Sequence, residues 1–268
     1  MPAIILVRGG GDLASGVAIR LHRAGLNVVI TELAQPVSVR RTVSFSEAIY
    51  DGQAVVENVG AHGIADPTDT LEVLNVLAKG QIPVVTDPEC ISARSLHPLA
   101  IVDARMQKRA PQRLSHNALL YVGLGPGFRS PENCQAVVET QRGHRLGRVI
   151  WKGTSLSDTA RPDGDQRRVL RAPADGAFIS EARIGTHFEL GEPIAAVGEE
   201  TIAAPFAGVL RGLLRPGLRV SKGMKVGDLD PRDDPTLCSL VSDKALAVGG
   251  AVLEALLTRP EVRAKLWA

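Results

Sequence analysis

Aromatic residues make up only 3% of this chain of 268 residues. Single-stranded nucleic acids bind largely by stacking on aromatic side chains, so this scarcity argues against that class of protein. Charge supports the same exclusion, because 31 basic and 29 acidic residues leave a formal net charge of +2. A chain with balanced charge has no excess of cations with which to bind a phosphate backbone. We therefore expect no nucleic-acid partner.

Cysteines are few, and long apolar runs are missing. The three cysteines are scattered, odd in number and without a C-x-x-C pair, which is typical of a reducing cytosol. No apolar run approaches the roughly 20 residues that span a membrane, and the start at Met1 has no signal-peptide pattern. The six histidines show no H-x-x-x-H or H-E-x-x-H spacing, so no metal site is expected. These observations predict a cytoplasmic protein without a membrane partner.

A glycine-rich turn lies near the start of the chain, between an expected strand at 4–7 and a helical pattern. It reads Gly9-Gly10-Gly11-Asp12-Leu13-Ala14, a G-x-G-x-x-A sequence. Gly9 permits the tight turn, Gly11 lets a pyrophosphate approach the backbone, and Ala14 lets the helix pack closely on the strand. The helix N-terminus also attracts phosphate. The pattern predicts a site for a nucleotide or another anion, with a tight turn that binds nothing as the alternative.

Charged residues flank this turn. Arg8 can hold a phosphate bidentately, whereas Asp12 brings negative charge to the same place or caps the helix. A second expected strand, at 28–31, is followed by Glu32, and an acidic residue there can bind ribose hydroxyls. Just beyond it, Arg40-Arg41 forms either a ribose-phosphate contact or a surface pair. The ligand-binding candidates in this region are Arg8, Gly9, Gly10, Gly11, Asp12 and Glu32.

A second glycine-rich turn follows an expected strand at 119–122. It reads Gly123-Leu124-Gly125-Pro126-Gly127-Phe128. Ligands of open α/β sheets bind beyond the carboxyl ends of the strands, so the two turns are expected to form two walls of one anion-binding crevice. A plain tight turn is the alternative. Gly123, Gly125 and Gly127 therefore join the candidates, and Asp87 and Asp103 at two other strand ends either face the crevice or cap a turn.

A basic loop between residues 139 and 148 contains the remaining candidates. Arginines are suited to phosphates and carboxylates, so we expect Arg142 or Arg148 to reach the bound anion. His144 can act as a general acid or base, but no nucleophile stands beside it in the sequence. No catalytic residue is assigned, and a solvated basic loop is the alternative.

Strand-like and helix-like runs alternate over the first half of the chain. The clearest helix is expected to begin with Asp66 as its N-cap and to end at Gly80. Its apolar residues at helical spacing are Leu71, Leu74 and Leu77. Alternation of this kind predicts an α/β fold, a Rossmann-like, mostly parallel sheet over residues 1–168. The expected strands are 4–7, 28–31, 54–56, 84–86, 100–102 and 119–122.

An internal repeat of 32 residues marks the second half. Ala172-Pro173-x-x-Gly176 recurs as Ala204-Pro205-x-x-Gly208, and three further positions match at the same offset. Short strands joined by glycine turns predict an all-β module over 169–235, its halves related by a pseudo-twofold axis. It resembles the barrel-sandwich, or hammerhead, fold of biotinyl and lipoyl domains. The stretch 198–202 between the halves has no lysine, so no covalent prosthetic group is expected.

The segment 236–268 is expected to form a capped helix that packs on the first domain. Gly249 and Gly250 lie within it, and each costs about 1 kcal/mol of helix propensity relative to alanine. Close packing against another backbone would offset that cost.

Several motifs in order resemble the YqeB family, accessory proteins of selenium-dependent molybdenum hydroxylases. They are V-R-G-G-G-D-L-A-S-G, T-E-L, R-R-T-V-S-F-S-E-A-I-Y, G-L-G-P-G-F, E-T-Q-R-G-H-R-L-G-R-V-I, R-V-L-R-A-P and S-D-K-A-L-A-V-G-G. The first domain also resembles the Rossmann domain of xanthine dehydrogenase accessory factors. The resemblance implies a maturation factor that helps to assemble, modify or insert the molybdenum cofactor, with a molybdenum hydroxylase as its partner.

Two other functions fit the same residues. One is an NAD(P)-dependent oxidoreductase, and the other is a non-enzymatic docking protein. The expected ligand is an anionic small molecule, either NAD(P) or the molybdenum cofactor in its dinucleotide form. Whether the protein is an enzyme or a homo-oligomer stays open at this stage.

Overall fold

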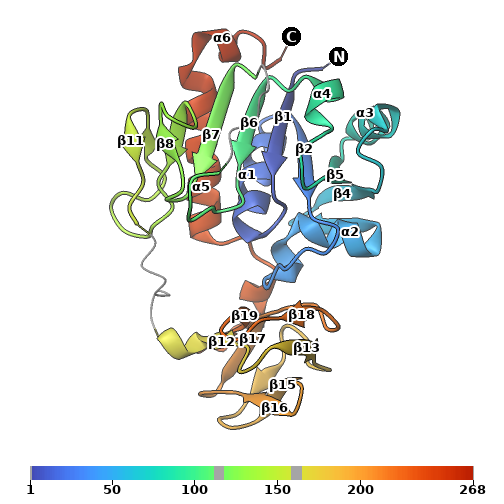
Figure 1. The fold of residues 1–268 in the computed structure, drawn as a ribbon, viewed down its shortest axis with the longest axis vertical. Coiled ribbons are helices and arrows are strands. Elements are labelled where there is room, and N and C mark those ends of the chain that lie inside the picture. The colour runs from blue at the N-terminus through green and yellow to red at the C-terminus, as the bar shows by residue number, and fades with distance from the viewer. Residues whose placement is uncertain (1, 112–117, 158–164, 268) are drawn as a thin grey trace. The chain divides into compact units, whose positions relative to one another are not determined.

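A computed structural model describes residues 2–111, 118–157 and 165–267. The chain divides into two compact units (Figure 1). Unit 1 consists of Met1–Pro36, Phe45–Thr159 and Val241–Ala268, and unit 2 consists of Val37–Ser44 and Ala160–Leu240. A short piece of the N-terminal half thus belongs to the second unit.

Unit 1 is built on a nine-stranded sheet in the order β10-β9-β7-β6-β1-β2-β5-β4-β3. Neighbouring strands are parallel except for the two edge pairs β3–β4 and β9–β10. The expected α/β class with a large, mostly parallel sheet is confirmed. The strands are β1 (Ile4–Arg8), β2 (Asn27–Glu32), β3 (Gln53–Val56), β4 (Val59–Ile64), β5 (Ile82–Thr86), β6 (Ala100–Asp103), β7 (Leu120–Leu124), β9 (Ala136–Val138) and β10 (Val149–Ile150). A separate small pair joins β8 (Arg129–Ser130) to β11 (Gly153–Thr154).

Helices of unit 1 flank this sheet. Ile4 of β1 belongs to one apolar cluster with residues of α3 and α4, whereas α1 and α5 lie side by side (Figure 1). The helices are α1 (Asp12–Arg23), α2 (Ala48–Asp51), α3 (Thr70–Ala78), α4 (Ala93–Leu96), α5 (Asp243–Thr258) and α6 (Pro260–Arg263), with a 3-10 turn, η2 (Phe45–Glu47), before α2.

Helix α3 begins one turn later than the sequence suggests. Its N-cap is Asp69, whose carboxylate accepts the backbone N–H of Glu72 at 2.9 Å, while Asp66 closes the preceding turn on Thr68. The fully buried residues of α3 are Val73 and Val76. Of the three leucines at helical spacing, Leu71 is 75% exposed, whereas Leu77 packs against the apolar cluster that contains the valines. Two aspartates stand near this terminus, and hydropathy alone does not choose between them.

Glycine allows α1 and α5 to pack closely. A Cβ placed on Gly249 would lie 2.6 Å from the carbonyl oxygen of Gly16, and one on Gly16 would lie 2.6 Å from the Cβ of Ala245. Backbone packing therefore explains Gly249, as expected. The expectation was wrong for Gly250, which is exposed and has nothing within 4 Å of its missing Cβ among the described residues.

These neighbouring glycines predict opposite effects of the same substitution. Gly250→Ala should raise the free energy of unfolding by about 1 kcal/mol, since it improves helix propensity without a clash. Gly249→Ala should lower it by about 1–3 kcal/mol, because the methyl group forces the helices apart. Urea denaturation of both variants checks this. Stabilisation by both substitutions would contradict the close packing of α1 and α5.

Unit 2 contains two antiparallel four-stranded sheets, in the orders β12-β19-β17-β14 and β16-β15-β13-β18. When 32 is added to the residue numbers of the first four strands, β12 to β15, they coincide with the last four, β16 to β19. If each strand is replaced by its counterpart, the strand order of one sheet becomes that of the other. The strand pairing of these two sheets therefore has the all-β, pseudo-twofold arrangement that the repeat predicts. The strands are β12 (Val169–Arg171), β13 (Gly176–Ile179), β14 (His187–Phe188), β15 (Pro193–Val197), β16 (Glu200–Ala203), β17 (Gly208–Leu213), β18 (Arg219–Val220) and β19 (Lys225–Asp230).

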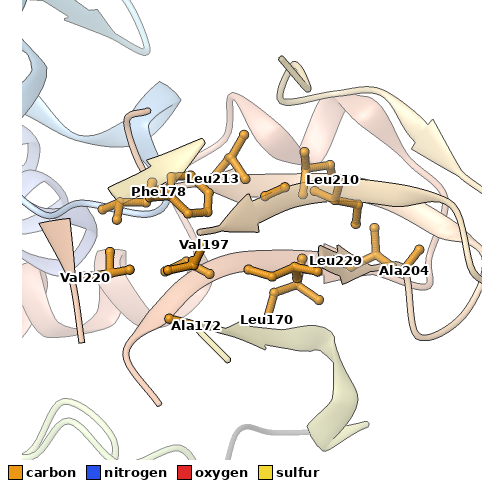
Figure 2. Packing of buried hydrophobic residues seen from close by; sticks show 14 of the residues in the cluster. Leu170, Ala172, Phe178, Val197, Ala204, Leu210, Leu213, Val220 and Leu229 are labelled. Atoms are coloured by element: carbon orange, nitrogen blue, oxygen red, sulfur yellow. The ribbon is translucent and has the colours of Figure 1, made fainter. Parts of the chain in front are cut away.

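The core of unit 2 lies between these sheets and repeats the symmetry (Figure 2). Phe178 and its counterpart Leu210 are both fully buried, and the two alanines of the A-P-x-x-G motifs, Ala172 and Ala204, are each 2% exposed. Each half contributes strands to both sheets, so neither half can bury its apolar residues alone.

The segment Val37–Ser44 is tied to unit 2 by hydrogen bonds. Leu213 donates its backbone N–H to the carbonyl of Val39 at 2.8 Å, and Arg41 donates to the carbonyl of Leu213 at 2.7 Å. Arg40 is buried and donates to the carbonyls of Leu237 and Leu240 at 3.0 and 2.9 Å. The arginine pair is therefore bound within the fold, which revises the expectation of a ribose-phosphate contact or a surface pair.

A cluster of charges is buried on β17 and β19. Asp228 accepts hydrogen bonds from Arg168 at 3.0 Å and from Arg211 at 2.7 Å, and both arginines also pair with Asp230. Burial alone would raise the pKa of Asp228, but the cations of Lys225, Arg211 and Arg168 outweigh it and lower that pKa. The pKa of Asp230 is also lowered, mainly by the hydrogen bond that Arg232 donates to it.

This cluster predicts acid sensitivity. A carboxyl whose pKa is lower in the folded state stabilises the fold above its unfolded pKa, about 3.9, and loses that contribution as the pH falls further. The contribution of this cluster to the unfolding free energy should therefore be constant from pH 7 to about 5 and fall below about pH 4. Urea denaturation followed by circular dichroism measures this. Asp228→Asn should be less stable at neutral pH, and its deficit should shrink in acid; an unchanged deficit would contradict the assignment.

Candidate functional site

The two glycine-rich turns lie at the same edge of the sheet. Strands β1, β6 and β7 are consecutive and parallel, so their carboxyl ends meet there, as expected. Strand β6 stands between the other two, and the segment that follows it occupies the space between the turns. A Cβ on Gly9 would lie 3.5 Å from Arg105, and one on Gly125 would lie 3.5 Å from Met106.

The first turn connects β1 to α1. Gly9 has φ +96, a conformation that favours glycine, and its N–H bonds to the carbonyl of Thr31 at 2.7 Å. Gly11 is the N-cap of α1 and has no side chain with which to cap it, and Asp12 follows in the first helical turn. The backbone therefore adopts the strand–turn–helix geometry that the motif predicts.

Glu32, at the end of β2, is bonded to this turn. Its carboxylate accepts the N–H of Gly10 at 2.6 Å through one oxygen and the N–H of Leu33 at 2.7 Å through the other. Burial raises the pKa of Glu32, and these two hydrogen bonds offset part of that rise. The acidic residue expected to bind ribose thus fixes the position of the glycine turn.

The segment that begins with Phe45 also packs on Gly10. Ser46 donates its N–H to the carbonyl of Gly10 at 2.9 Å, and Phe45 donates to the hydroxyl of Ser15 at 2.8 Å. A Cβ on Gly10 would lie 3.0 Å from the backbone nitrogen of Ser46. Glycine at this position is therefore explained by the chain itself.

A buried polar network joins the ends of β1, β6 and β7. Asp103 is fully buried and accepts hydrogen bonds from Arg8 at 3.4 Å, from the Tyr121 hydroxyl at 2.9 Å and from Arg105 at 2.6 Å. Burial, followed by the charge of Asp103, raises the pKa of Tyr121, which keeps its hydroxyl protonated as a donor. Arg8 also donates to the carbonyl of Pro88. Arg8 was expected to hold a phosphate; its guanidinium is instead bound inside the protein.

Arg105 is the cation of this network that reaches solvent. Its side chain is 30% exposed, compared with 5% for Arg8. Asp103 holds it with a second bond, from Nε at 2.9 Å, which fixes the orientation of the guanidinium. The Cγ of the same side chain would lie 3.5 Å from a Cβ on Gly9. A fixed arginine next to a glycine turn and a helix N-terminus is suited to an anion.

Other strand ends have different roles. Asp87, after β5, accepts the N–H groups of Ile91 and Ser92 at 2.8 Å and so caps a turn, one of the two roles expected for it. Burial raises the pKa of the neighbouring Cys90 to about 11, so its thiol stays protonated at neutral pH. Neither side chain is available as a nucleophile or a free charge.

The glycines of the second turn are explained by packing. A Cβ on Gly123 would clash with the ring of Phe128, and one on Gly127 would clash with the carbonyl oxygen of Arg109. The N–H of Gly127 donates to the carbonyl of Gln107 at 2.8 Å. The structure thus revises the expectation of two facing walls, since the protein chain fills the space at both of these glycines.

The basic loop lies beyond β9, three strand positions from β1, which is about 14 Å at the usual spacing. Arg142 forms a bidentate pair with Asp243 at the start of α5, at 2.5 and 2.7 Å. Arg148 donates to the carbonyl of His144, whose side chain is exposed. The structure does not bring these three candidates to the first turn, so the expectation that Arg142 or Arg148 binds the same anion is revised.

Sequence analysis missed Arg105 and Tyr121. Arg105 follows the expected strand 100–102 by a few residues, so its position after a strand end was an available signal. Tyr121 lies inside an apolar strand, and nothing in its local pattern separates it from a core residue.

The network predicts unequal costs for two substitutions. Asp103→Asn should lower the unfolding free energy by about 3–5 kcal/mol, because it leaves the buried Arg8 without its counter-charge. Tyr121→Phe should cost about 1 kcal/mol, since it removes one hydrogen bond. Denaturant unfolding measures both. If both variants lost a similar, small amount of unfolding free energy, Asp103 would not be the counter-charge of the buried Arg8.

No helix in the described parts of the chain is both long and apolar enough to cross a membrane. The chain shares 13% sequence identity and a TM-score of 0.27 with an aspartoacylase family protein of Mesorhizobium loti, over 85% of this chain and 84% of that one. It shares 11% identity and a TM-score of 0.25 with the ectoine utilization protein EutE (DoeB) of Ruegeria pomeroyi, over 85% and 86% of the two chains. Scores this low carry no argument about fold or function.

Sequence comparison gives a clear relative. No family model matches the chain. It is 43% identical over 258 residues to a protein of Escherichia coli K12 named "Uncharacterized protein YqeB", a match that covers 95% of this chain and 47% of that protein. The chain therefore spans about half the length of this relative. At this identity and coverage, the chain belongs to the YqeB family.

Proposed function

We propose that unit 1 binds a phosphate-bearing small molecule where β1 and β6 end, and that the protein serves as an accessory factor in molybdenum hydroxylase maturation. One observation carries the binding proposal: Asp103 holds the partly exposed side chain of Arg105, whose Cγ would lie 3.5 Å from a Cβ on Gly9. The maturation role rests on the resemblance to the YqeB family. It is a proposal about the whole protein, of which this chain matches about half of a relative's length.

Strand order supports a Rossmann-like assignment of unit 1. Reading β5-β2-β1-β6-β7-β9 across the sheet gives the doubly wound order 3-2-1-4-5-6. In such sheets the ligand binds where the strand order reverses, which here is between β1 and β6. Gly9 and Arg105 follow these two strands, so the proposed site coincides with the position that the topology favours.

Charge at this position favours an anion. Asp103 is paired with both Arg8 and Arg105, so the two cations exceed the one carboxylate they share. The N-terminus of α1 adds partial positive charge next to Gly11. The carboxylates of Asp12 and Glu32 work against this, so we place the phosphate on the side of the turn that faces Arg105.

Unit 2 fits a docking role. A shift of 32 residues relates the strands of one sheet to those of the other, as a barrel-sandwich duplication requires. As part of this proposal, we assign unit 2 to the barrel-sandwich fold class. The turn between β15 and β16 consists of Gly198 and Glu199, and the stretch 198–202 has no lysine to carry a prosthetic group. We propose that this module recognises the client hydroxylase.

The binding proposal predicts a specific loss in one arginine variant. Arg105→Gln should weaken binding of inorganic pyrophosphate at least about tenfold, since a hydrogen bond to a charged group contributes about 1.5–3 kcal/mol. Arg142→Gln removes the same charge from the distant basic loop and serves as the matched control. Isothermal titration calorimetry measures both affinities. Equal affinities in the two variants, with folding intact, would remove Arg105 from the site.

The maturation proposal needs its own test. The protein would be purified from cells that synthesise molybdenum cofactor and examined by native mass spectrometry. A bound mass that matches the cofactor, and that is lost in Arg105→Gln, supports the proposal. Protein that carries no such mass, and that forms no complex with a molybdenum hydroxylase, contradicts it.

A further inference from the structure

We infer that this site accepts a compact phosphate monoester and excludes the adenosine half of a dinucleotide. The inference rests on the proposed function, because it concerns which anions the same site can hold. It distinguishes two ligands that the glycine motif alone allows, a dinucleotide and a smaller phosphorylated molecule.

A dinucleotide uses the β2 side of the first glycine turn. In doubly wound sheets its pyrophosphate lies on the turn, and its adenosine ribose lies against the acidic residue that follows β2. Here that residue is Glu32, and the turn is Gly9–Gly11. Space beside Gly10 and a carboxylate free to accept ribose hydroxyls are both required.

The space beside Gly10 is filled. Ser46 bonds to the carbonyl of Gly10 at 2.9 Å, and its backbone nitrogen stands 3.0 Å from where a Cβ of Gly10 would be. Even a methyl group at this glycine would press on Ser46, so a ribose ring has no room there. Ser46 is itself fully buried and is held by its neighbour Phe45, which bonds to Ser15 within α1.

Glu32 is also engaged. Both of its oxygens already accept backbone N–H groups, from Gly10 at 2.6 Å and from Leu33 at 2.7 Å. A ribose diol would have to compete for the Glu32 oxygens with the backbone N–H groups that hold the turn in place. We therefore assign Glu32 as a positioning residue for the glycine turn.

The β6 side differs, because there the side chain of Arg105 is 30% exposed and its Cγ would lie 3.5 Å from a Cβ on Gly9. A terminal phosphate monoester carries up to two negative charges and can accept bidentate hydrogen bonds from one arginine. The diester phosphates of a dinucleotide carry one charge each and bring bulk on both sides. The geometry thus favours a small molecule whose phosphate lies at its end.

Competition binding to the intact protein tests this. Inorganic phosphate, ribose 5-phosphate and NAD are compared by calorimetry. We expect ribose 5-phosphate to bind at least tenfold more tightly than NAD, and NAD to bind no more tightly than inorganic phosphate. Glu32→Gln should weaken every probe by a similar factor, because it loosens the turn without removing a ribose contact.

The possible outcomes separate the two proposals. NAD binding at least tenfold more tightly than inorganic phosphate, with that preference lost in Glu32→Gln, overturns this inference and leaves the anion site standing. If none of the three probes binds the folded protein, both the inference and the proposed anion site fail. The comparison on the unmodified protein decides the matter even where the variant does not fold.

Discussion

The buried carboxylate of Asp103 is the contact on which the candidate site depends. It joins the ends of three adjacent strands, because Arg8 comes from β1, Asp103 from β6 and Tyr121 from β7. A single fully buried charge is costly to hold, and here two arginines and a hydroxyl compensate it. The same carboxylate also binds Arg105 through two hydrogen bonds. Asp103 therefore both stabilises this edge of the sheet and orients the partly exposed cation.

A different constraint organises unit 2. Its symmetry needs both halves of the repeat, and its hydrogen bonds also need Val37–Ser44 from far upstream. The chain therefore passes between the units at four places, after residues 36, 44, 159 and 240. A fragment containing only residues 165–240 would lack Arg40 and Arg41, so the carbonyls of Leu213, Leu237 and Leu240 would lose their arginine donors. Unit 2 is therefore one compact unit that is formed by two separate segments of the chain.

Sequence predicted the regular parts well for a physical reason. Each of the six expected strands lies at a strand of the sheet. Five of them are buried parallel strands, which are continuous apolar runs, and the sixth, at 54–56, lies in the antiparallel edge strand β3. Strand β4 was missed because Gly60 and Gly63 interrupt its apolar pattern, and the structure explains one of them: a Cβ on Gly63 would meet the carbonyl of Ala48. The repeat was visible because glycine and proline at turns tolerate few replacements.

The site was harder to predict, because its charges find partners across long sequence separations. Arg8 meets Asp103 over 95 residues and Arg142 meets Asp243 over 101, so neither pairing leaves a local pattern. Gly123 and Gly127 were interpreted through a ligand, whereas neighbouring chain atoms require their small size. Residue types alone do not distinguish an arginine that binds a ligand from one that neutralises a buried carboxylate.

The same reasoning separates the glycine motif from its ligand. G-x-G-x-x-A specifies a backbone path, and the strand, turn and helix follow that path here. What the turn can hold depends on the residues around it: Ser46 and Glu32 on one side and Arg105 on the other. These neighbours come from segments that the motif does not include. Ligand preference in this fold is therefore a property of the loops after β2 and β6, and variation in those loops can change the ligand while the motif stays the same.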